Sequence, residues 1–367
     1  MRSACSRRSA EGSAAQDQSC ATEALGVVPM TAYLLVFAGA LVLSIALTPL
    51  ARYLAPHLGI IDQPSARKVH RTPVPRLGGV AIYLAVLAAA IALGERYNFA
   101  QFGSIIIGAT AVSFMGLVDD RWGLRPAVKL VGQILAALLL WATGVRVGTF
   151  GQPVADFLLT VFWVVYITNA INLLDNMDGL AGGIAAIAAA HFALMCSFSG
   201  QYLVGALAVA VLAACLGFLF YNLNPASIFM GDSGALFLGF MLAAIGIKLR
   251  FPDNVTFVTW MVPVLVLGLP IFDTALVTLS RLRRGKNPLT TPGKDHVSHR
   301  LVAAGLSQRE AVLTLYVVSF VLGLLAVFVT RASVVEGYIV GGAAALLGAW
   351  GLWRMERPPF WSGAVHE

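Results

Sequence analysis

The sequence of 367 residues contains few charges. Asp, Glu, Lys and Arg make up only 12% of it, whereas 58% of the residues are hydrophobic, and the mean hydropathy is +0.81. This is more apolar surface than a soluble core of this length needs, so the composition excludes a soluble globular protein and predicts a polytopic membrane protein. We find no internal repeat and no polar stretch long enough to form a soluble domain.

Cysteine is also scarce, and the four cysteines do not indicate a disulfide framework. Cys5 and Cys20 lie in a polar leader, while Cys196 and Cys215 lie within apolar segments, where cysteine usually packs as a small hydrophobic residue. The leader, residues 1–29, has no apolar stripe, and its charges fit a signal peptide badly. We interpret it as a disordered leader or as the result of a start codon assigned too early.

Long apolar segments dominate the rest of the chain. A bilayer core of about 30 Å needs about 20 apolar helical residues, and eleven segments approach this length. They are residues 31–50, 78–95, 103–118, 127–144, 156–171, 179–198, 202–221, 234–249, 256–279, 311–331 and 337–354. We therefore expect an all-α bundle of about 11 transmembrane helices in one domain, residues 30–355, followed by a tail at 356–367. The fifth and eighth segments are short.

The basic residues predict how the bundle is oriented. Loops that follow odd-numbered segments hold 17 of the 25 Lys and Arg residues, counting the C-terminal tail, and the opposite loops hold five. By the positive-inside rule the first side is cytoplasmic, with the N-terminus outside and the C-terminus inside. The net charge of +7 reflects this bias and contact with anionic head groups, so we do not interpret it as nucleic-acid binding.

Acidic and amide residues interrupt the apolar pattern at three places. They are the pair Asp119–Asp120, the run NAINLLDNMD at 169–178, and Asp232. A carboxylate at mid-bilayer costs about 2.5–3.5 kcal/mol on insertion scales. All three clusters lie at the ends of apolar segments and on the predicted cytoplasmic side. They therefore predict one polar site at that membrane face.

Each cluster has a functional interpretation and a simpler one. Asp119 and Asp120 repel each other unless a cation is shared there, which Lys129, Arg125 or a divalent metal could provide; a plain helix-end pair is the alternative. Asp232 lies between two glycines and could be a helix cap. In the run at 169–178, one helical face would present several oxygen ligands and amides together, and packing alone does not explain them.

Two predicted cytoplasmic loops are basic. The first, at 62–79, carries Arg67, Lys68, His70, Arg71 and Arg76 between prolines, and anchoring to head groups is its simplest interpretation. The second, at 281–311, contains His296, His299 and Arg300 among other cationic residues. Its histidines lack the spacing of a zinc protease motif, so anion binding fits this loop better.

Together the loops would form a site of oxygen ligands suited to Mg²⁺, ringed by Lys, Arg and His side chains that bind phosphates. Such a site at a membrane surface suits phosphoryl transfer between a soluble nucleotide and a lipid phosphate. Both reactants are anions, so charge neutralisation would be the largest catalytic contribution.

These motifs carry a resemblance to a known family. The ordered set DxPxxRKxHxxPxPRxGG, GLVDDRWGLRP with KLxxQ, NAINLLDNMDGLAGG, FMGDSGALFLG and KDHVSHRL is similar to the polyprenyl-phosphate N-acetylhexosamine-1-phosphate transferases, over about residues 31–316. The resemblance implies ten or eleven transmembrane helices with a cytoplasmic active-site cleft. It also implies transfer of HexNAc-1-phosphate, most often GlcNAc-1-phosphate, from UDP-HexNAc to undecaprenyl phosphate, with release of UMP and with Mg²⁺ or Mn²⁺ as cofactor.

The resemblance also implies roles for individual residues. Asp232 and Asn172 would contact the metal, and Asp119 and Asp120 would form the catalytic pair near the lipid phosphate. The substrate-binding residues would be Lys68, Lys129, Asp175, Asp178, His296, His299 and Arg300. Many relatives have a histidine where this chain has Ser298, so the role of that histidine would fall to His296. Asp273 fits the hexosamine branch, and an interhelical hydrogen bond is its alternative role.

Three other functions are less well supported by the sequence. The peptidoglycan phospho-MurNAc-pentapeptide transferase belongs to the same superfamily, but this chain lacks its run of histidines. A secondary transporter would place its binding groups near the midplane, in two related halves. An intramembrane aspartyl protease needs a GxGD sequence, which Phe229 and Met230 before Gly231 do not provide. A homodimer is compatible with the sequence, which does not indicate the oligomeric state, the hexosamine or the downstream polymer.

Overall fold

The structure is a computed structural model that describes residues 30–63, 73–92, 99–288, 291 and 293–360. The predicted leader at 1–29, the predicted phosphate ligand Lys68 and residues 361–367 of the predicted tail lie outside the described residues.

The described chain is almost entirely helical, which confirms the all-α class. The helices of the first half are α3 (Met30–Leu58), α4 (Gly78–Ala92), α5 (Phe99–Trp122), α6 (Pro126–Ala142), α7 (Pro153–Leu174) and α8 (Leu180–Phe198). Those of the second half are α9 (Tyr202–Asn222), α10 (Gly231–Lys248), α11 (Thr256–Thr259), α12 (Met261–Val266), α13 (Gly268–Arg283), α14 (Val297–Ala303), α15 (Gln308–Val329) and α16 (Val334–Met355). Two short strands, β1 (Ile61–Asp62) and β2 (Val74–Pro75), pair antiparallel.

Each of the eleven predicted apolar segments coincides with one or more helices among the described residues. Among the described residues, eight helices are long and apolar enough to cross a membrane, or nine if one bent pair counts as a single span. The fifth and eighth segments, expected to be short, form the full-length helices α7 and α10, whereas α4 and α6 are the shorter apolar helices. The protein is therefore a multi-pass membrane protein, and the exact number of spans stays a prediction.

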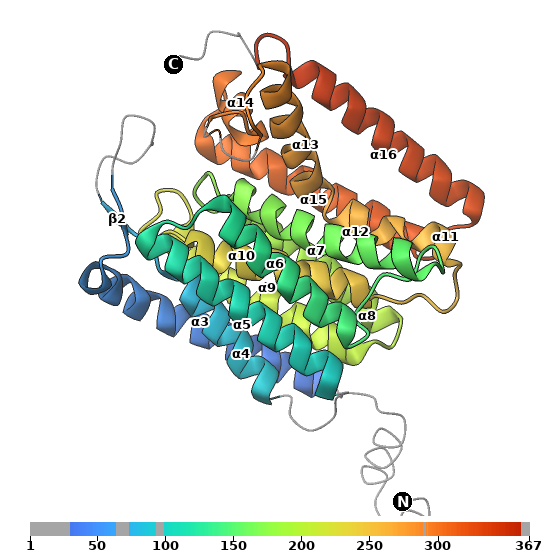
Figure 1. Cartoon of the computed structure of the whole chain (residues 1–367), viewed down its shortest axis with the longest axis horizontal. Coiled ribbons are helices and arrows are strands. Elements are labelled where there is room, and N and C mark those ends of the chain that lie inside the picture. Colours follow the sequence, from blue (N-terminus) through green and yellow to red (C-terminus); the bar gives the residue numbers. More distant parts are fainter. Residues whose placement is uncertain (1–29, 64–72, 93–98, 289–290, 292, 361–367) are drawn as a thin grey trace, which may run out of the picture.

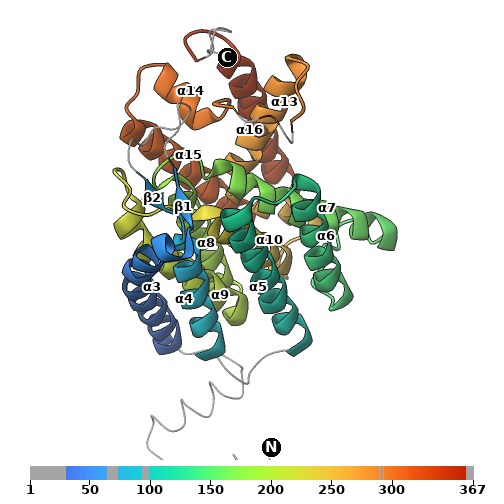
Figure 2. The ribbon, with the colours of Figure 1, turned by 60° about the vertical axis from the view of Figure 1, so that its left-hand side comes forward.

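The ninth segment, 256–279, was expected to be one straight span and is broken. The helices at Thr256–Val266 and Gly268–Arg283 meet at an angle of 71°. Pro263 and Pro270 lie on either side of this break, and each removes a backbone donor from the helical ladder. The bend directs α13 toward α14, at the end of the bundle where both lie in Figures 1 and 2.

Helix α10 forms the centre of the bundle (Figure 1), and 94% of its apolar window is buried. Small residues allow neighbouring helices to approach it closely. A Cβ atom on Gly79 of α4 would lie 2.1 Å from the backbone nitrogen of Gly234, and one on Gly116 of α5 would lie 2.4 Å from the carbonyl carbon of Asp232. These contacts bring the ends of α4 and α5 against the first turn of α10.

The β-hairpin lies at the same end of the bundle as α13 and α14 (Figure 2). The Phe229 N–H donates to the Pro75 carbonyl (2.8 Å), and the Gly78 N–H donates to the Phe229 carbonyl (3.0 Å). The hairpin is thus bound to the loop at residues 223–230 that leads into α10. Hairpin, loop and α10 position the site described below.

The predicted orientation can be tested with single cysteines. Lys286 is exposed after α13, at the site end, and Asp253 is exposed on the connection after α10, at the opposite end. In a variant with Cys5 and Cys20 changed to Ser, we expect Asp253→Cys to react with a membrane-impermeant maleimide in intact cells. Lys286→Cys should react only after lysis. The reverse pattern would overturn the orientation.

Candidate active site

Three aspartates and two cations from four parts of the chain alternate at the start of α10. Arg76, directly after β2, contacts Asp120 through Nε (3.1 Å) and Asp232 through Nη2 (3.0 Å). Lys129, in the first turn of α6, donates from Nζ to Asp119 (2.8 Å) and to Asp232 (3.0 Å). Asp232 therefore binds both cations, and each cation binds a second aspartate from α5.

Asp120 caps the central helix from outside. Its carboxylate, which is completely buried, accepts hydrogen bonds from the backbone N–H groups of Asp232 (2.9 Å) and Ser233 (3.0 Å). A carboxylate at a helix N-terminus satisfies free donors and interacts favourably with the helix dipole. Gly231 precedes this turn with a φ of 75°. The alternative that Asp232 is the cap is therefore wrong, because Asp120 makes the capping bonds.

The run at 169–178 does not continue as one helix. Helix α7 ends at Leu174, and residues 175–179 form turns before α8 begins. The Asn176 side chain donates to the Leu173 carbonyl, an interaction that competes with the helical ladder, and Gly179 adopts a φ of 76°. The prediction that one helical face presents all the ligands of this run is therefore wrong beyond Leu174.

Asp175 lies at the end of α7 and faces the aspartates around α10. Burial raises the pKa of its carboxyl group to about 7; the positive charge of Arg76 opposes this, and the charges of Asp232, Asp120 and Asp178 add to it. Within the described part of the chain, its carboxylate accepts no hydrogen bond. Asp175 is thus a carboxylate among other carboxylates, a location that favours a bound cation.

Asp178 and Asn169 have structural partners. The Asp178 carboxylate accepts hydrogen bonds from the Asn224 side chain and from the Ala226 N–H group, both at 3.0 Å. It thereby holds the loop before α10 against the start of α8. Asn169 pairs with Gln133 of α6. Of the amides in the run, the Asn172 side chain has no hydrogen-bond partner among the described residues.

His296, directly before α14, and Ser298, within α14, contact two predicted motifs. His296 donates from Nδ1 to Asp273 of α13 (2.7 Å), which also accepts from the Val297 N–H group (2.7 Å). Asp273 therefore positions the start of α14. Ser298 donates to the Asn176 side chain, which connects α14 with the turns after α7. Burial, together with nearby His296 and Lys294, lowers the pKa of His299 to about 4, so its ring is neutral at neutral pH.

Arg300 is bound entirely inside the protein. Its side chain is 1% exposed, and its guanidinium group contacts the Ser280 hydroxyl, the Asp295 carbonyl, the Met355 carbonyl and Glu356. These contacts connect α14 with α13 and with the end of α16. The predicted contact of Arg300 with a sugar diphosphate stays a prediction, and its observed partners support a role in positioning α14.

The donor set is compatible with a divalent cation. Five carboxylates, those of Asp119, Asp120, Asp175, Asp178 and Asp232, lie with two cations in this region. Among the described residues no three acidic, histidine or cysteine side chains surround a single point. Mg²⁺ is usually held by one or two carboxylates together with substrate phosphates and water. Asp232 and Asp175 therefore fit such an ion if a ligand completes its coordination.

Comparisons with known proteins show the family of this chain. A family model described as glycosyl transferase family 4 matches residues 102–250. A probable undecaprenyl-phosphate N-acetylglucosaminyl 1-phosphate transferase of Bacillus subtilis is 38% identical, covering 78% of this chain and 82% of that protein. The chain belongs to glycosyl transferase family 4. A decaprenyl-phosphate N-acetylglucosaminephosphotransferase of Mycobacterium leprae is 35% identical (79% and 81% covered), and a phospho-N-acetylmuramoyl-pentapeptide-transferase of Bacillus cytotoxicus is 29% identical (81% and 97% covered).

The match to family 4 spans α5 to α10 and so includes most of the predicted site. Lys129, Asn172, Asp175 and the three aspartates around α10 lie within it. Arg76 lies outside it, and the sequence indicated only that Arg76 belongs to a basic loop. Its central position is the main feature that sequence reasoning missed. The sequence did contain one signal for this position: Arg76 lies two residues before the Gly78–Gly79 pair at the start of α4.

Removing Arg76 should destabilise the protein. Arg76→Ala leaves the buried carboxylate of Asp120 without its cation, and removing one member of a buried pair costs about 3–5 kcal/mol. Because the Arg76 side chain is 36% exposed, we expect about 3 kcal/mol, measured as a lower unfolding temperature in detergent. Arg331→Ala, at the opposite end of the bundle, is the control. Equal unfolding temperatures of the two variants would contradict the role of Arg76.

Proposed function

We propose that the protein transfers GlcNAc-1-phosphate from UDP-GlcNAc to undecaprenyl phosphate and releases UMP. Relatives whose names specify GlcNAc transfer range from 28% to 38% identity, and the two described above, at 38% and 35%, exceed the pentapeptide transferase at 29%. The product, undecaprenyl-diphospho-GlcNAc, would start a cell-envelope polysaccharide. We further propose that the site lies on the cytoplasmic face of the cell membrane, where soluble UDP-sugars are available.

The observation that carries this proposal is the alternation of carboxylates with Arg76 and Lys129 at one end of a membrane bundle. A UDP-sugar and a lipid phosphate are both anions and repel each other. Cationic side chains and a metal ion reduce this repulsion, and such charge neutralisation is the main catalytic contribution in phosphoryl transfer. The location at the end of apolar helices suits one soluble substrate and one lipid substrate.

In the proposed reaction, an oxygen of the lipid phosphate attacks the β-phosphorus of the UDP-sugar. The bond between the β-phosphorus and the bridging oxygen breaks, and UMP leaves with that oxygen. Lys129 and Arg76 would bind phosphate oxygens, and Asp119 and Asp120 would position the lipid phosphate or accept its proton. Mg²⁺, when bound at Asp232 with Asn172 or Asp175 nearby, would supply charge neutralisation for the diphosphate.

The substrate is tested by supplying purified membranes with a panel of labelled UDP-sugars and measuring label in butanol-extractable lipid. We expect UDP-GlcNAc to be the preferred donor. Label transferred only from UDP-MurNAc-pentapeptide would show instead a pentapeptide transferase, and no lipid label from any donor would overturn the proposed function.

The metal role of Asp232 predicts a large loss of activity. Asp232→Asn keeps the size of the side chain but removes its charge, and we expect a rate lower by at least about 10²-fold. The Mg²⁺ concentration for half-maximal activity should also rise. Asp253→Asn, in an exposed loop at the opposite end, should leave both values unchanged. Near-normal activity of Asp232→Asn would exclude this residue as the metal ligand.

Direct attack by the lipid phosphate predicts that no covalent intermediate forms. Without a lipid acceptor, the enzyme should not exchange labelled UMP into UDP-GlcNAc, because cleavage of the donor then requires the acceptor. The measurement is label in UDP-GlcNAc after incubation of lipid-depleted enzyme. Substantial exchange would require a phosphorylated aspartate and would identify one of the Asp119–Asp120 pair as nucleophile.

A further inference from the structure

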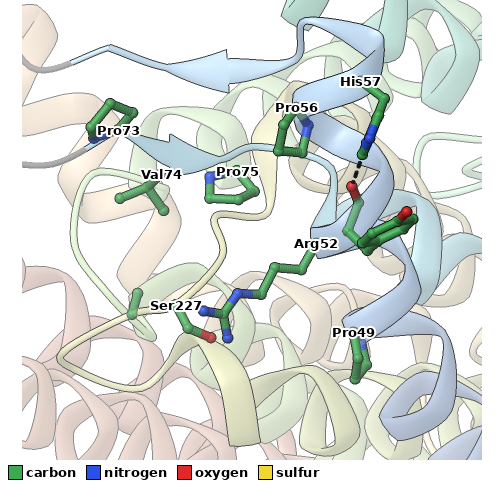
Figure 3. A pocket seen from close by; sticks show the side chains of 10 residues that line it. Pro49, Arg52, Pro56, His57, Pro73, Val74, Pro75 and Ser227 are labelled. Carbon is green, nitrogen blue, oxygen red and sulfur yellow. Dashed lines mark hydrogen bonds between the residues drawn. The ribbon is translucent and has the colours of Figure 1, made fainter.

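A cavity lies outside the aspartate site, between the end of α3 and the hairpin. Its volume is about 720 Å³. One wall is the stripe of α3 that contains Pro49, Arg52, Tyr53, Pro56 and His57. The opposite walls are residues 73–75 of the hairpin and residues 226–227 of the loop before α10 (Figure 3). The stripe repeats at three- and four-residue spacing and so forms one face of the helix.

The cavity is built to receive an anion. Figure 3 shows the guanidinium group of Arg52 extending across it toward Ser227. Within the described part of the chain Arg52 has no hydrogen bond or ion pair, in contrast to Arg76. Of the ten residues that line the cavity, none is acidic, and the hydroxyl group of Tyr53 offers a further donor. The prolines supply rigid apolar walls.

The cavity opens where α3 faces lipid. Its neighbours Leu50, Leu54 and Leu58 are 39–50% exposed, and Tyr53 is 66% exposed. In a membrane protein such exposed apolar side chains contact acyl chains, while Arg, His and Tyr occupy the interfacial level. An anion bound by Arg52 would therefore have an apolar surface beside it. This combination matches a phosphate group that is attached to a lipid.

We propose that this cavity binds the phosphate head group of an anionic membrane phospholipid. Arg52 supplies the charge, Tyr53 supplies an additional donor, His57 forms part of the wall, and the acyl chains lie along α3. The site is separate from that of the acceptor, because β2 lies between them: Pro75 lines the cavity, and the next residue, Arg76, binds the active-site aspartates.

The bound lipid supports the active site through the hairpin. Pro75 accepts a hydrogen bond from Phe229, and the Arg76 N–H donates to the Ile60 carbonyl (3.1 Å) at the end of α3. A lipid held between α3 and the hairpin therefore stabilises the position of Arg76. This consequence rests on the proposed function, whereas binding itself does not.

Binding is measured by native mass spectrometry of the purified full-length protein, titrated separately with phosphatidylglycerol and phosphatidylcholine. We expect Arg52→Ala to bind phosphatidylglycerol about fivefold more weakly, because a loss of this size corresponds to the attraction of one basic residue to an anionic surface. Binding of phosphatidylcholine should be unchanged. Arg52→Lys should retain most of the preference, and Arg331→Ala all of it. His57→Ala, a second change within the cavity, should weaken phosphatidylglycerol binding less than Arg52→Ala.

Unchanged phosphatidylglycerol binding by both Arg52→Ala and His57→Ala would overturn the proposal. Displacement of the lipid by inorganic phosphate would assign the cavity to a soluble anion, and displacement by undecaprenyl phosphate would assign it to the acceptor; either result also overturns it. Transferase activity in vesicles with and without phosphatidylglycerol then tests the connection to Arg76. Selective lipid binding by an inactive protein would reject the transferase function while leaving the lipid site intact.

Discussion

The ion pairs around Asp232 are the interaction on which the arrangement of this end of the bundle depends. Asp232 lies at the start of the most buried helix, where an unpaired carboxylate would be costly. It is stable there because Arg76 and Lys129 both reach it, and because Asp120 and Asp119 bind the far sides of those cations. Four parts of the chain must therefore meet at one place: the segment after β2, the end of α5, and the starts of α6 and α10.

The same pairing explains how the site could accept anionic substrates at a membrane surface. Before substrate binds, Arg76 and Lys129 are already partly desolvated and bound to carboxylates. A phosphate oxygen that replaces a carboxylate oxygen would exchange one charge-assisted contact for another, so each cation would lose less of its hydration shell at that moment. In the proposed reaction, the displaced carboxylates of Asp119 and Asp232 would become available to a metal ion.

Much of this arrangement could be predicted from the sequence. Placing a carboxylate inside a membrane is costly for each acidic residue on its own, so the sequence indicates where that residue lies without knowledge of its partners. This cost is the basis of the prediction. The sequence predicted that Asp119, Asp120 and Asp232 lie at one membrane face. It also predicted that the cation of Lys129 could offset the repulsion within the aspartate pair. It could not predict the role of Arg76, which depends on a partner 156 residues away, or the end of α7 at Leu174, which depends on local hydrogen bonds of the Asn176 side chain. The break between α12 and α13 was hidden because averaged hydropathy does not respond to Pro263 or Pro270.

Ser298 shows how a departure from the family pattern can be explained by packing. Its side chain is completely buried, and its hydroxyl group donates to Asn176. An imidazole ring at this position would need space that the buried hydroxyl group does not leave. Ser298 therefore connects α14 with the turns that carry Asp175 and Asp178, while Asp273 fixes His296 by a separate hydrogen bond. The two neighbouring positions at the start of α14 are thus held by separate contacts, and the role of His299 stays a prediction.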